Sequence, residues 1–161
     1  NARSDILRRD FTINGLFFDP ISGQLLDFCE GVHDIKRGLI RTIGDPQQRF
    51  EEDSLRVLRA IRFASQFEFR IDDKTWQSLC QKAIGLNRVS QERIGEELLK
   101  ILTGEGAHRG LRLLLETGIL EIILPEVARM DGIKQPPQFH PEGDVFVESD
   151  KLYEKKKQKI L

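Results

Sequence analysis

Helical periodicity over residues 46 to about 126 constrains the fold of this chain more than any other feature of its sequence. Apolar side chains recur there every three or four residues, and glycine, asparagine and aspartate mark the breaks between runs. The expected helices lie near 46–68, 73–84, 90–103, 106–117 and 119–129. An array of helices should therefore make up most of the chain.

The first 45 residues have a different pattern, which is typical of a small sheet. Aromatic and β-branched residues flank a turn at 19–23 and predict a β-hairpin. The expected elements are strands over 13–18 and 24–28, a helix over 31–38 and a strand over 39–43. The fold class is therefore α+β, with a partial small β-sheet followed by a mostly α-helical part.

Composition excludes several classes of protein. The 161 residues carry 25 Lys and Arg against 26 Asp and Glu, so any binding of nucleic acid must come from local patches. Cys29 and Cys80 are isolated, which suggests neither a zinc cluster nor a disulfide framework. No apolar run approaches the roughly 20 residues that cross a bilayer. We expect a soluble, cytoplasmic protein without a membrane partner, and Asn1 suggests a piece of a longer one.

The predicted helix over 46–68 has two chemically different sides. An aspartate and three arginines follow one another at intervals of three residues: Asp53, Arg56, Arg59 and Arg62. At about 100° per residue, Val57, Ala60, Ile61 and Ala64 fall on an apolar side, and the arginines sweep across the opposite one. One side should pack, and the other can meet a ligand.

Asp53 and Arg56 are expected to be neighbours on this helix, where the carboxylate can brace the guanidinium. Together they would present an acceptor beside a planar fork of donors. That pattern matches the edges of cytosine and adenine but not those of guanine and uracil. A mismatch leaves buried polar groups unpaired, at about 1–3 kcal/mol each. The alternative is a solvated helix face with local ion pairs.

Two further clusters of polar residues lie outside this helix. Arg8, Arg9 and Asp10 come directly before the first predicted strand, where arginine suits phosphate oxygens and aspartate suits a ribose hydroxyl. The alternative is an ordinary charged start of a strand. Ser90 predicts the N-terminus of a helix, with Glu92 in its first turn and Arg93 where a capping box would place an acid.

Three motifs occur in order along the chain: Arg8-Arg9-Asp10-Phe11-Thr12-Ile13-Asn14, Glu52-Asp53-x-x-Arg56-x-x-Arg59-x-x-Arg62-Phe63 and Ser90-x-Glu92-Arg93-Ile94-x-x-Glu97-Leu98. Together they resemble class II tRNA nucleotidyltransferases, the CCA-adding enzymes, and bacterial poly(A) polymerases. The likeness covers roughly residues 5–147. It implies that 1–45 is the C-terminal part of a nucleotidyltransferase head domain, with a helical neck and start of the body over 46–130. A Pro-rich loop and a Lys-rich tail would follow over 131–161.

The resemblance also implies roles for individual residues. Arg9 would contact the nucleotide, Asp10 would help to hold its ribose or phosphates, and Asp53 with Arg56 would form the template that pairs with CTP or ATP. Arg59 and Arg62 would line the triphosphate side. The supporting residues are Glu52, Ser90, Glu92 and Arg93.

One departure from the family pattern bears on catalysis. The family holds two Mg²⁺ ions with an Asp-x-Asp pair on an early strand, next to a glycine-containing phosphate motif, and neither occurs in this sequence. The pairs Asp72-Asp73 and Glu96-Glu97 lack that context, so no residue of the chain is assigned as catalytic or as a metal ligand. Two-metal phosphoryl transfer needs such carboxylates. The chain alone is therefore expected to be inactive.

The expected function is template-independent nucleotidyl transfer, with CMP and AMP added to the 3′ end of tRNA, or AMP alone added to an RNA. ATP and CTP would be the substrates. Two alternatives stay open: a non-catalytic RNA-binding module derived from this family, and a helical scaffold whose arginines form surface ion pairs. Oligomeric state, and the choice among CCA, A-only and poly(A) addition, are left undecided.

Overall fold

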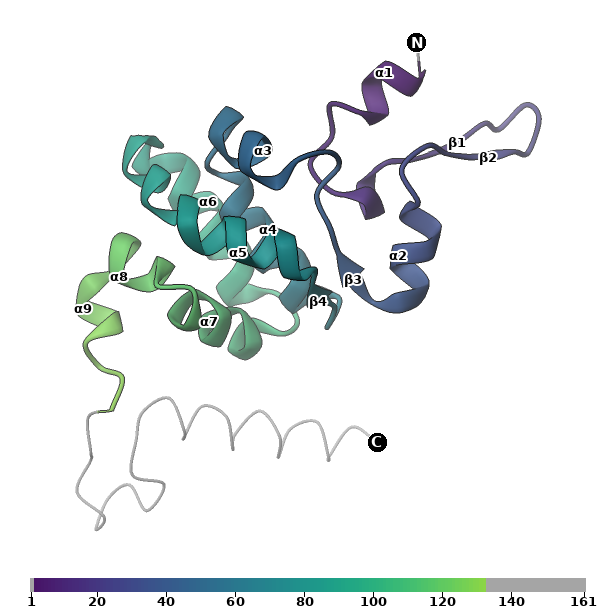
Figure 1. Cartoon of the computed structure of the whole chain (residues 1–161). Helices are drawn as coiled ribbons and strands as arrows, with labels where there is room; N and C mark the ends of the chain where they lie inside the picture. The colour runs from purple at the N-terminus through teal and green to yellow at the C-terminus, as the bar shows by residue number, and fades with distance from the viewer. Residues whose placement is uncertain (1, 133–161) are drawn as a thin grey trace, which may run out of the picture.

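The computed structural model describes residues 2–132, and it confirms the α+β fold class (Figure 1). The first elements are α1 (Ala2–Ile6), the 3-10 helix η1 (Thr12–Asn14), β1 (Leu16–Phe18), β2 (Leu25–Asp27), α2 (Gly31–Arg37) and β3 (Leu39–Ile40). The helical part comprises α3 (Pro46–Glu52), α4 (Arg56–Gln66), α5 (Asp73–Lys82), η2 (Ala83–Arg88), α6 (Gln91–Thr103), α7 (Ala107–Glu116), α8 (Ile119–Ile123) and α9 (Pro125–Ala128), with β4 (Arg70–Ile71) before α5. The predicted Pro-rich loop and Lys-rich tail lie almost wholly outside the described residues.

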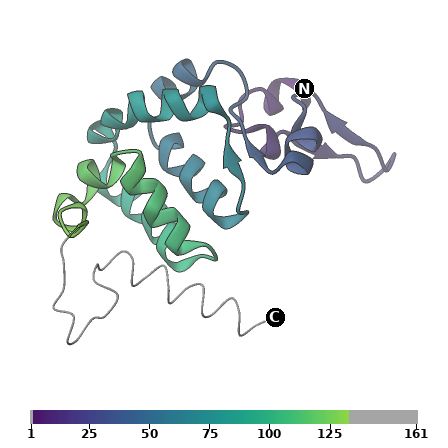
Figure 2. The same ribbon diagram turned by 60° about the horizontal axis from the view of Figure 1, so that its bottom comes forward.

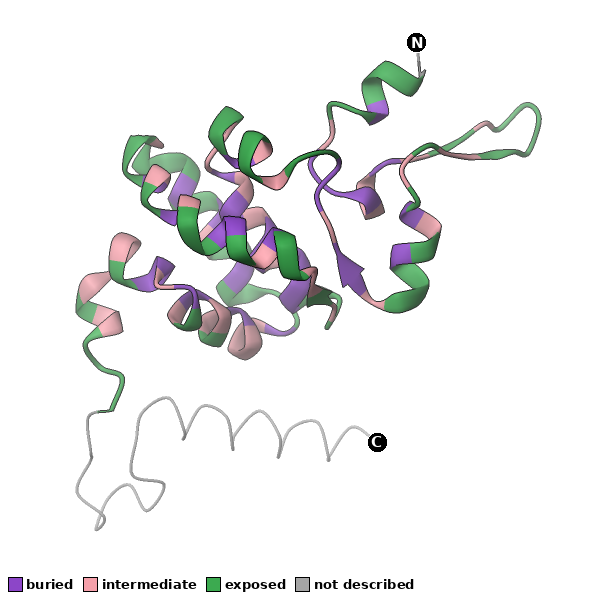
Figure 3. Cartoon of the chain, in the orientation of Figure 1, coloured by how far each residue is buried: buried purple, intermediate pink, exposed green. Residues whose placement is uncertain are grey.

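The predicted hairpin is confirmed. β1 and β2 pair antiparallel, with Phe18 opposite Leu25, and the Asp19 carboxylate accepts hydrogen bonds from Ile21 and Ser22 in the turn. The hairpin projects away from the helices in both ribbon views (Figures 1 and 2). Figure 3 colours it almost entirely as exposed or intermediate, so it contributes little to the core.

The expectation of one small sheet in the first 45 residues is wrong. β3 pairs in parallel with β4, with Leu39 opposite Arg70, and forms a two-stranded sheet separate from the hairpin. β4 follows α4 in the chain, so this pairing depends on a contact that no local pattern in the sequence reveals. Through this sheet, β3 at the end of the first 45 residues packs directly against α4.

The expectation of one helix over 46–68 is also wrong, because the chain turns a corner between α3 and α4. Asp53 has an extended backbone (φ −150°, ψ 103°), and its Oδ1 accepts a hydrogen bond from the Leu55 N–H at 3.1 Å. A short aspartate side chain competes for backbone donors in this way and favours turns over helix interiors. Asp45 and Pro46 begin α3 as an N-cap and a first-turn proline.

The core forms around α4, which packs against α6 and α7. The predicted apolar side is confirmed, because Val57, Ala60, Ile61 and Ala64 are fully buried. Gly106, with φ +75°, lets α7 begin against the end of α4, where a Cβ at this position would lie 2.2 Å from the Ser65 carbonyl oxygen. α4 is therefore held rigidly on its apolar side, which fixes the direction of its polar side.

The remaining helices follow the predictions with shorter ends. α6 and α7 occupy the expected ranges, whereas α5 ends at Lys82 and continues as the 3-10 helix η2. The expected helix over 119–129 is divided into α8 and α9 at Leu124, ahead of Pro125, because proline starts a helix more readily than it continues one. Every helix of the described residues is too short or too polar to cross a membrane.

Candidate functional site

A cavity of about 580 Å³ lies where the Arg8–Asp10 segment meets the α3–α4 corner and the first turn of α6. Its lining residues are Arg8, Arg9, Asp10, Asn14, Asp53, Leu55, Arg56, Arg59, Phe63 and Arg93. Six of the ten residues to which the family resemblance gives a role are in this lining, together with Arg8. The four others, Glu52, Arg62, Ser90 and Glu92, are not. The structure thus brings together residues of all three motifs, which extend from Arg8 to Arg93 along the chain.

Asp10 is the buried carboxylate of this cavity. Its Oδ1 accepts hydrogen bonds from the Phe11 N–H and from Asn14 Nδ2, and its Oδ2 accepts one from Arg59 Nε at 2.6 Å. Burial raises the pKa of Asp10, but the Asn14 hydrogen bond and the Arg59 charge more than offset this and hold the pKa below its ordinary value. Asp10 is therefore a charged group that orients Arg59.

Arg9, which also lines the cavity, is positioned by its own contacts. Its Nη1 donates to the Asn14 carbonyl oxygen at 2.8 Å, and its Nη2 donates to Asp5 at 3.1 Å. The guanidinium also lies 5.6 Å from the centre of the Phe17 ring. Arg9 and Arg59 thus hold positive charge in the cavity without being free to rearrange.

The predicted contact between Asp53 and Arg56 is not made, because the helix that would align them is broken at Asp53. Asp53 Oδ2 instead pairs with Arg93 Nη2 at 3.0 Å. Arg56 Nη1 donates to Glu52 Oε2 and to the Arg49 carbonyl oxygen, both at 2.8 Å. The Asp53 carboxylate and the Arg56 guanidinium still line the same cavity, but Arg93 positions the first and Glu52 the second.

The supporting residues divide into those that touch the site and those that act at a distance. Glu52 and Arg93 contact Arg56 and Asp53 directly. The predicted cap at Ser90 is confirmed, since its Oγ accepts from the Arg93 N–H at 3.5 Å and so begins the helix that carries Arg93. Glu92 is exposed in the first turn of α6, where a carboxylate favours the helix N-terminus.

Arg62 faces away from the cavity and towards α6. Its Nε donates to Glu97 Oε2 at 2.8 Å, and its guanidinium lies 4.1 Å from the centre of the Phe63 ring. Arg59 Nη1 approaches the same carboxylate, at 3.9 Å from Glu97 Oε1. Glu97 therefore positions two arginines of α4, Arg59 and Arg62, from the α6 side of the helix.

Glu97 stands in the third family motif, but the sequence assigned it no role, either as a metal ligand or as a partner of the arginines. It is buried with Ile94 and Ile101 on one face of α6, and this spacing of three and four residues was a signal that could have found it. Burial raises the pKa of Glu97, but hydrogen bonds from Arg62 and Lys100 more than offset this and hold the pKa below its ordinary value. Asn14, which also supports the site, ends the first family motif, whereas Arg49 carries no comparable signal.

The donor set of the described residues does not fit a pair of magnesium ions. Residues 2–132 contain no group of three or more His, Cys, Asp or Glu side chains arranged to hold a metal. Asp10, the buried carboxylate in the cavity, is committed to Arg59, Asn14 and a backbone N–H. Asp72 caps α5 by accepting from the N–H groups of Lys74 and Thr75.

Comparison with known proteins adds two family matches. Residues 1–41 match the family described as "Poly A polymerase head domain", and residues 68–130 match "Probable RNA and SrmB- binding site of polymerase A". Curated relatives include the CCA-adding enzymes of Lactobacillus helveticus, 40% identical over 142 residues, and of Bacillus licheniformis, 41% identical over 135. These alignments cover 88% and 84% of this chain but 34% and 33% of the relatives.

Solved structures give the same result. The CCA-adding enzyme of Bacillus stearothermophilus in complex with CTP is 41% identical, with a TM-score of 0.71 over 74% of this chain and 30% of that one. The Thermotoga maritima CCA-adding enzyme complexed with tRNA_CCA is 35% identical, with a TM-score of 0.72 over 78% of this chain and 31% of that one. The chain thus spans about a third of the length of these relatives.

Proposed function

Because this chain belongs to the family of CCA-adding enzymes and poly(A) polymerases, we propose that it selects the nucleotide for such an enzyme. The observation that carries the proposal is the single cavity that holds Asp53 and Arg56 beside Arg9 and Arg59. An acceptor and a planar fork lie there within reach of further guanidinium groups. This is the set of groups that a cytidine or adenosine triphosphate would need.

The base-reading end of the cavity consists of Asp53 and Arg56. Both of the Arg56 hydrogen bonds to protein use Nη1, so the Nη2 edge of the fork is the one that would donate to the ring-nitrogen acceptor of cytosine or adenine. The Asp53 carboxylate would accept from the exocyclic amino group. Guanine and uracil would place a carbonyl oxygen against a carboxylate, and a hydrogen bond would be lost.

The rest of the cavity suits a polyanion. Its lining has five arginines against two aspartates, and Asp10 is already neutralised by Arg59. Arginine pairs with phosphate oxygens through parallel N–H groups, which gives both charge and orientation. Arg8, Arg9 and Arg59 are therefore the residues that we assign to the triphosphate.

The reaction of such an enzyme would be attack of an RNA 3′-hydroxyl on the α-phosphorus of CTP or ATP, with pyrophosphate leaving. Magnesium would supply charge neutralisation for that step. Since the described residues do not fit magnesium, no catalytic step is assigned to them. Their part is to bind the nucleotide, to orient it and to exclude the wrong base.

The test is a comparison of nucleotide affinities. The chain should bind CTP and ATP more tightly than UTP and GTP in equilibrium titrations, and Asp53→Ala or Arg56→Ala should reduce that preference by about 5- to 150-fold, the equivalent of 1–3 kcal/mol. Glu121→Ala, an exposed change on α8 outside the cavity, is the matched control and should leave the preference unchanged. Selection over UTP and GTP that survives both cavity variants would refute the proposal.

A second candidate function is RNA binding without catalysis. It is favoured by the match of residues 68–130 to a family described as a probable RNA-binding site. Titration of the chain with tRNA at two salt concentrations, beside an assay for nucleotide incorporation, separates the two. Binding that weakens steeply with salt, without nucleotide selection or incorporation, would favour the RNA-binding module.

A further inference from the structure

Arg49 contacts both rims of the cavity without lining it. This residue of α3 is mostly buried, with 11% of its side chain exposed. Its Nη2 donates to the carbonyl oxygens of Arg8, at 2.7 Å, and of Arg9. Its Nη1 pairs with Glu52 Oε2 at 2.5 Å, and its own carbonyl oxygen accepts from Arg56 Nη1. One residue thus joins the rim that carries the phosphate-side arginines to the rim that carries the base-reading pair.

We infer that Arg49 is a positioning residue that sets the separation between these two rims, an inference that rests on the proposed function. A nucleotide is a ligand of fixed length, so its base edge meets Asp53 and Arg56 only when the phosphates are held at the matching distance. The rims belong to segments about forty residues apart in the chain, and Arg49 is bonded to both. Loss of that bond would let one rim shift against the other.

The chemistry of the guanidinium explains why arginine is needed at this position. Its two Nη groups diverge in a rigid plane, so one can donate to two carbonyl oxygens while the other pairs with a carboxylate. A lysine ammonium is one point on a flexible chain and cannot occupy both places. Arg49 Nε is buried without a hydrogen-bond partner among the described residues, so the side chain is held by its fork despite an unsatisfied donor.

A shift of the rims should affect selectivity more than total affinity. The arginines would still attract a triphosphate of any base. The base edge, however, would no longer meet Asp53 and Arg56 in register, so cytosine and uracil would bind more nearly alike. A simple structural role predicts the opposite result, namely a lower melting temperature with an unchanged ratio of affinities.

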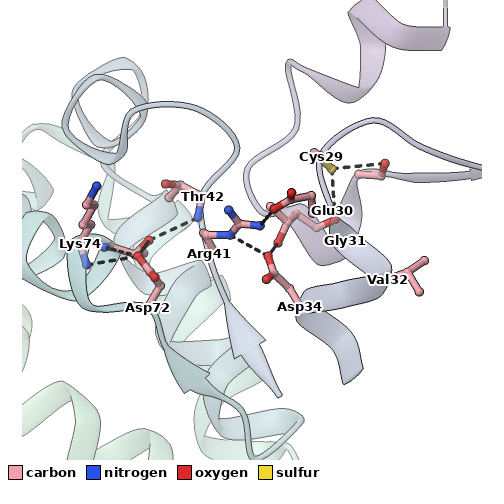
Figure 4. A network of polar contacts seen from close by, with 12 residues as sticks. Cys29, Glu30, Gly31, Val32, Asp34, Arg41, Thr42, Asp72 and Lys74 are labelled. Atoms are coloured by element: carbon pink, nitrogen blue, oxygen red, sulfur yellow. Dashed lines mark hydrogen bonds and ion pairs between the residues drawn. The ribbon is translucent and has the colours of Figure 1, made fainter. Parts of the chain in front are cut away.

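The experiment uses Arg49→Lys in the full 161-residue chain, with Arg41→Lys as its matched control. Arg41 also joins two carboxylates through its guanidinium, Asp34 at 2.8 Å and Glu30 at 2.8 Å (Figure 4), but it does not line the cavity. Calorimetric titration gives dissociation constants for CTP, ATP, UTP and GTP, and thermal melts give the change in stability. Both variants should melt earlier, and only Arg49→Lys should lower the ratio of CTP to UTP affinity, by about tenfold, since a misplacement of 1 Å can cost up to about 100-fold.

The outcomes are distinct. If the wild-type chain selects CTP over UTP and Arg49→Lys keeps that ratio, the inference is overturned and the proposed function stands. If the wild-type chain shows no selection, both fall. Should Arg49→Lys fail to fold, Arg49→Gln, which loses the guanidinium fork but keeps a planar N–H donor, is the second variant, and an unchanged ratio in it also overturns the inference.

Discussion

Among the cavities formed by residues 2–132, a pair lined by arginine and carboxylate side chains differ in charge and in how they are built. The proposed nucleotide cavity, of about 580 Å³, has five arginines against two aspartates in its lining. The second cavity, of about 350 Å³, lies around Arg41, with Lys74 and Asp72 in its lining. Figure 4 shows Arg41 directed to Asp34 and Glu30, with Thr42, Asp72 and Lys74 on the other side. The lining of the larger cavity has three more cations than carboxylates, whereas that of the smaller has one more, so the larger cavity suits a triphosphate better.

The ion pairs of the two cavities also differ in their separation along the chain. Arg41 reaches carboxylates 7 and 11 residues away. In the nucleotide cavity and behind it, Arg59 reaches Asp10 across 49 residues, Arg93 reaches Asp53 across 40, and Arg62 reaches Glu97 across 35. The larger cavity is therefore a product of the tertiary fold, and its geometry should fail when one of its long-range pairs is removed.

The largest effect on stability is expected from Glu97→Ala. This change leaves the mostly buried Arg62 guanidinium without its carboxylate, and loss of one partner of a buried pair costs about 3–5 kcal/mol of unfolding free energy. Glu30→Ala, which removes an exposed partner of Arg41, should cost less than about 1 kcal/mol. Urea denaturation of both variants measures the difference. Equal losses of unfolding free energy in Glu97→Ala and Glu30→Ala would show that the Arg62–Glu97 pair contributes no more to stability than the exposed Arg41–Glu30 pair.

The next effect concerns the affinity for nucleotide. Arg59→Ala should weaken CTP binding by about 10- to 100-fold, because a hydrogen bond to a charged group contributes about 1.5–3 kcal/mol. Arg41→Ala should change it by less than about threefold, since that guanidinium is saturated by Asp34 and Glu30. Titrations at a temperature where both variants are folded test the contrast. A comparable loss in Arg41→Ala would place the nucleotide in the wrong cavity.

A pH titration tests the buried carboxylates. The pKa values of Asp10 and Glu97 are lowered in the folded chain, so their stabilisation is complete above the unfolded values of about 4 and is lost as the pH falls through the folded ones. Below about pH 4 the unfolding free energy should fall by up to about 1.4 kcal/mol per pH unit for each group. The double variant Asp10→Asn, Glu97→Gln should have a flatter profile in urea denaturation. A slope identical to that of the wild type would assign the acid sensitivity to other groups.

The sequence predicts those parts of the molecule that depend on neighbouring residues. The hairpin follows from its turn at Asp19, and the start of α6 follows from the cap at Ser90. The break at Asp53 was missed because helical periodicity continues across it, whereas a single side-chain hydrogen bond to Leu55 decides the local conformation. The pairing of β3 with β4 was missed because its partners are far apart in the chain.

The candidate site shows the same limit. The resemblance to a family identified residue types, and the structure places six of the ten in one cavity. It could not identify their partners: Asp53 was expected to brace Arg56 but pairs with Arg93, and Arg62 was expected at the triphosphate but pairs with Glu97. Such contacts depend on how helices pack, which a pattern along one helix does not contain.

The smallest effect is expected where a local signal supports a long-range pair. Ser90→Ala removes the cap of α6, and a lost cap typically costs about 0.5–2 kcal/mol, here at the low end because the hydrogen bond is 3.5 Å long and exposed. The first turn that would fray carries Arg93, the partner of Asp53. Selection of CTP over UTP should therefore fall slightly, by about two- to threefold, in the same direction as in Asp53→Ala. Ser90→Asp, which keeps an acceptor at the cap, should restore both the melting temperature and the ratio of affinities. Selectivity that stays at the wild-type value while Ser90→Ala melts earlier would show that Asp53 keeps its position without Arg93.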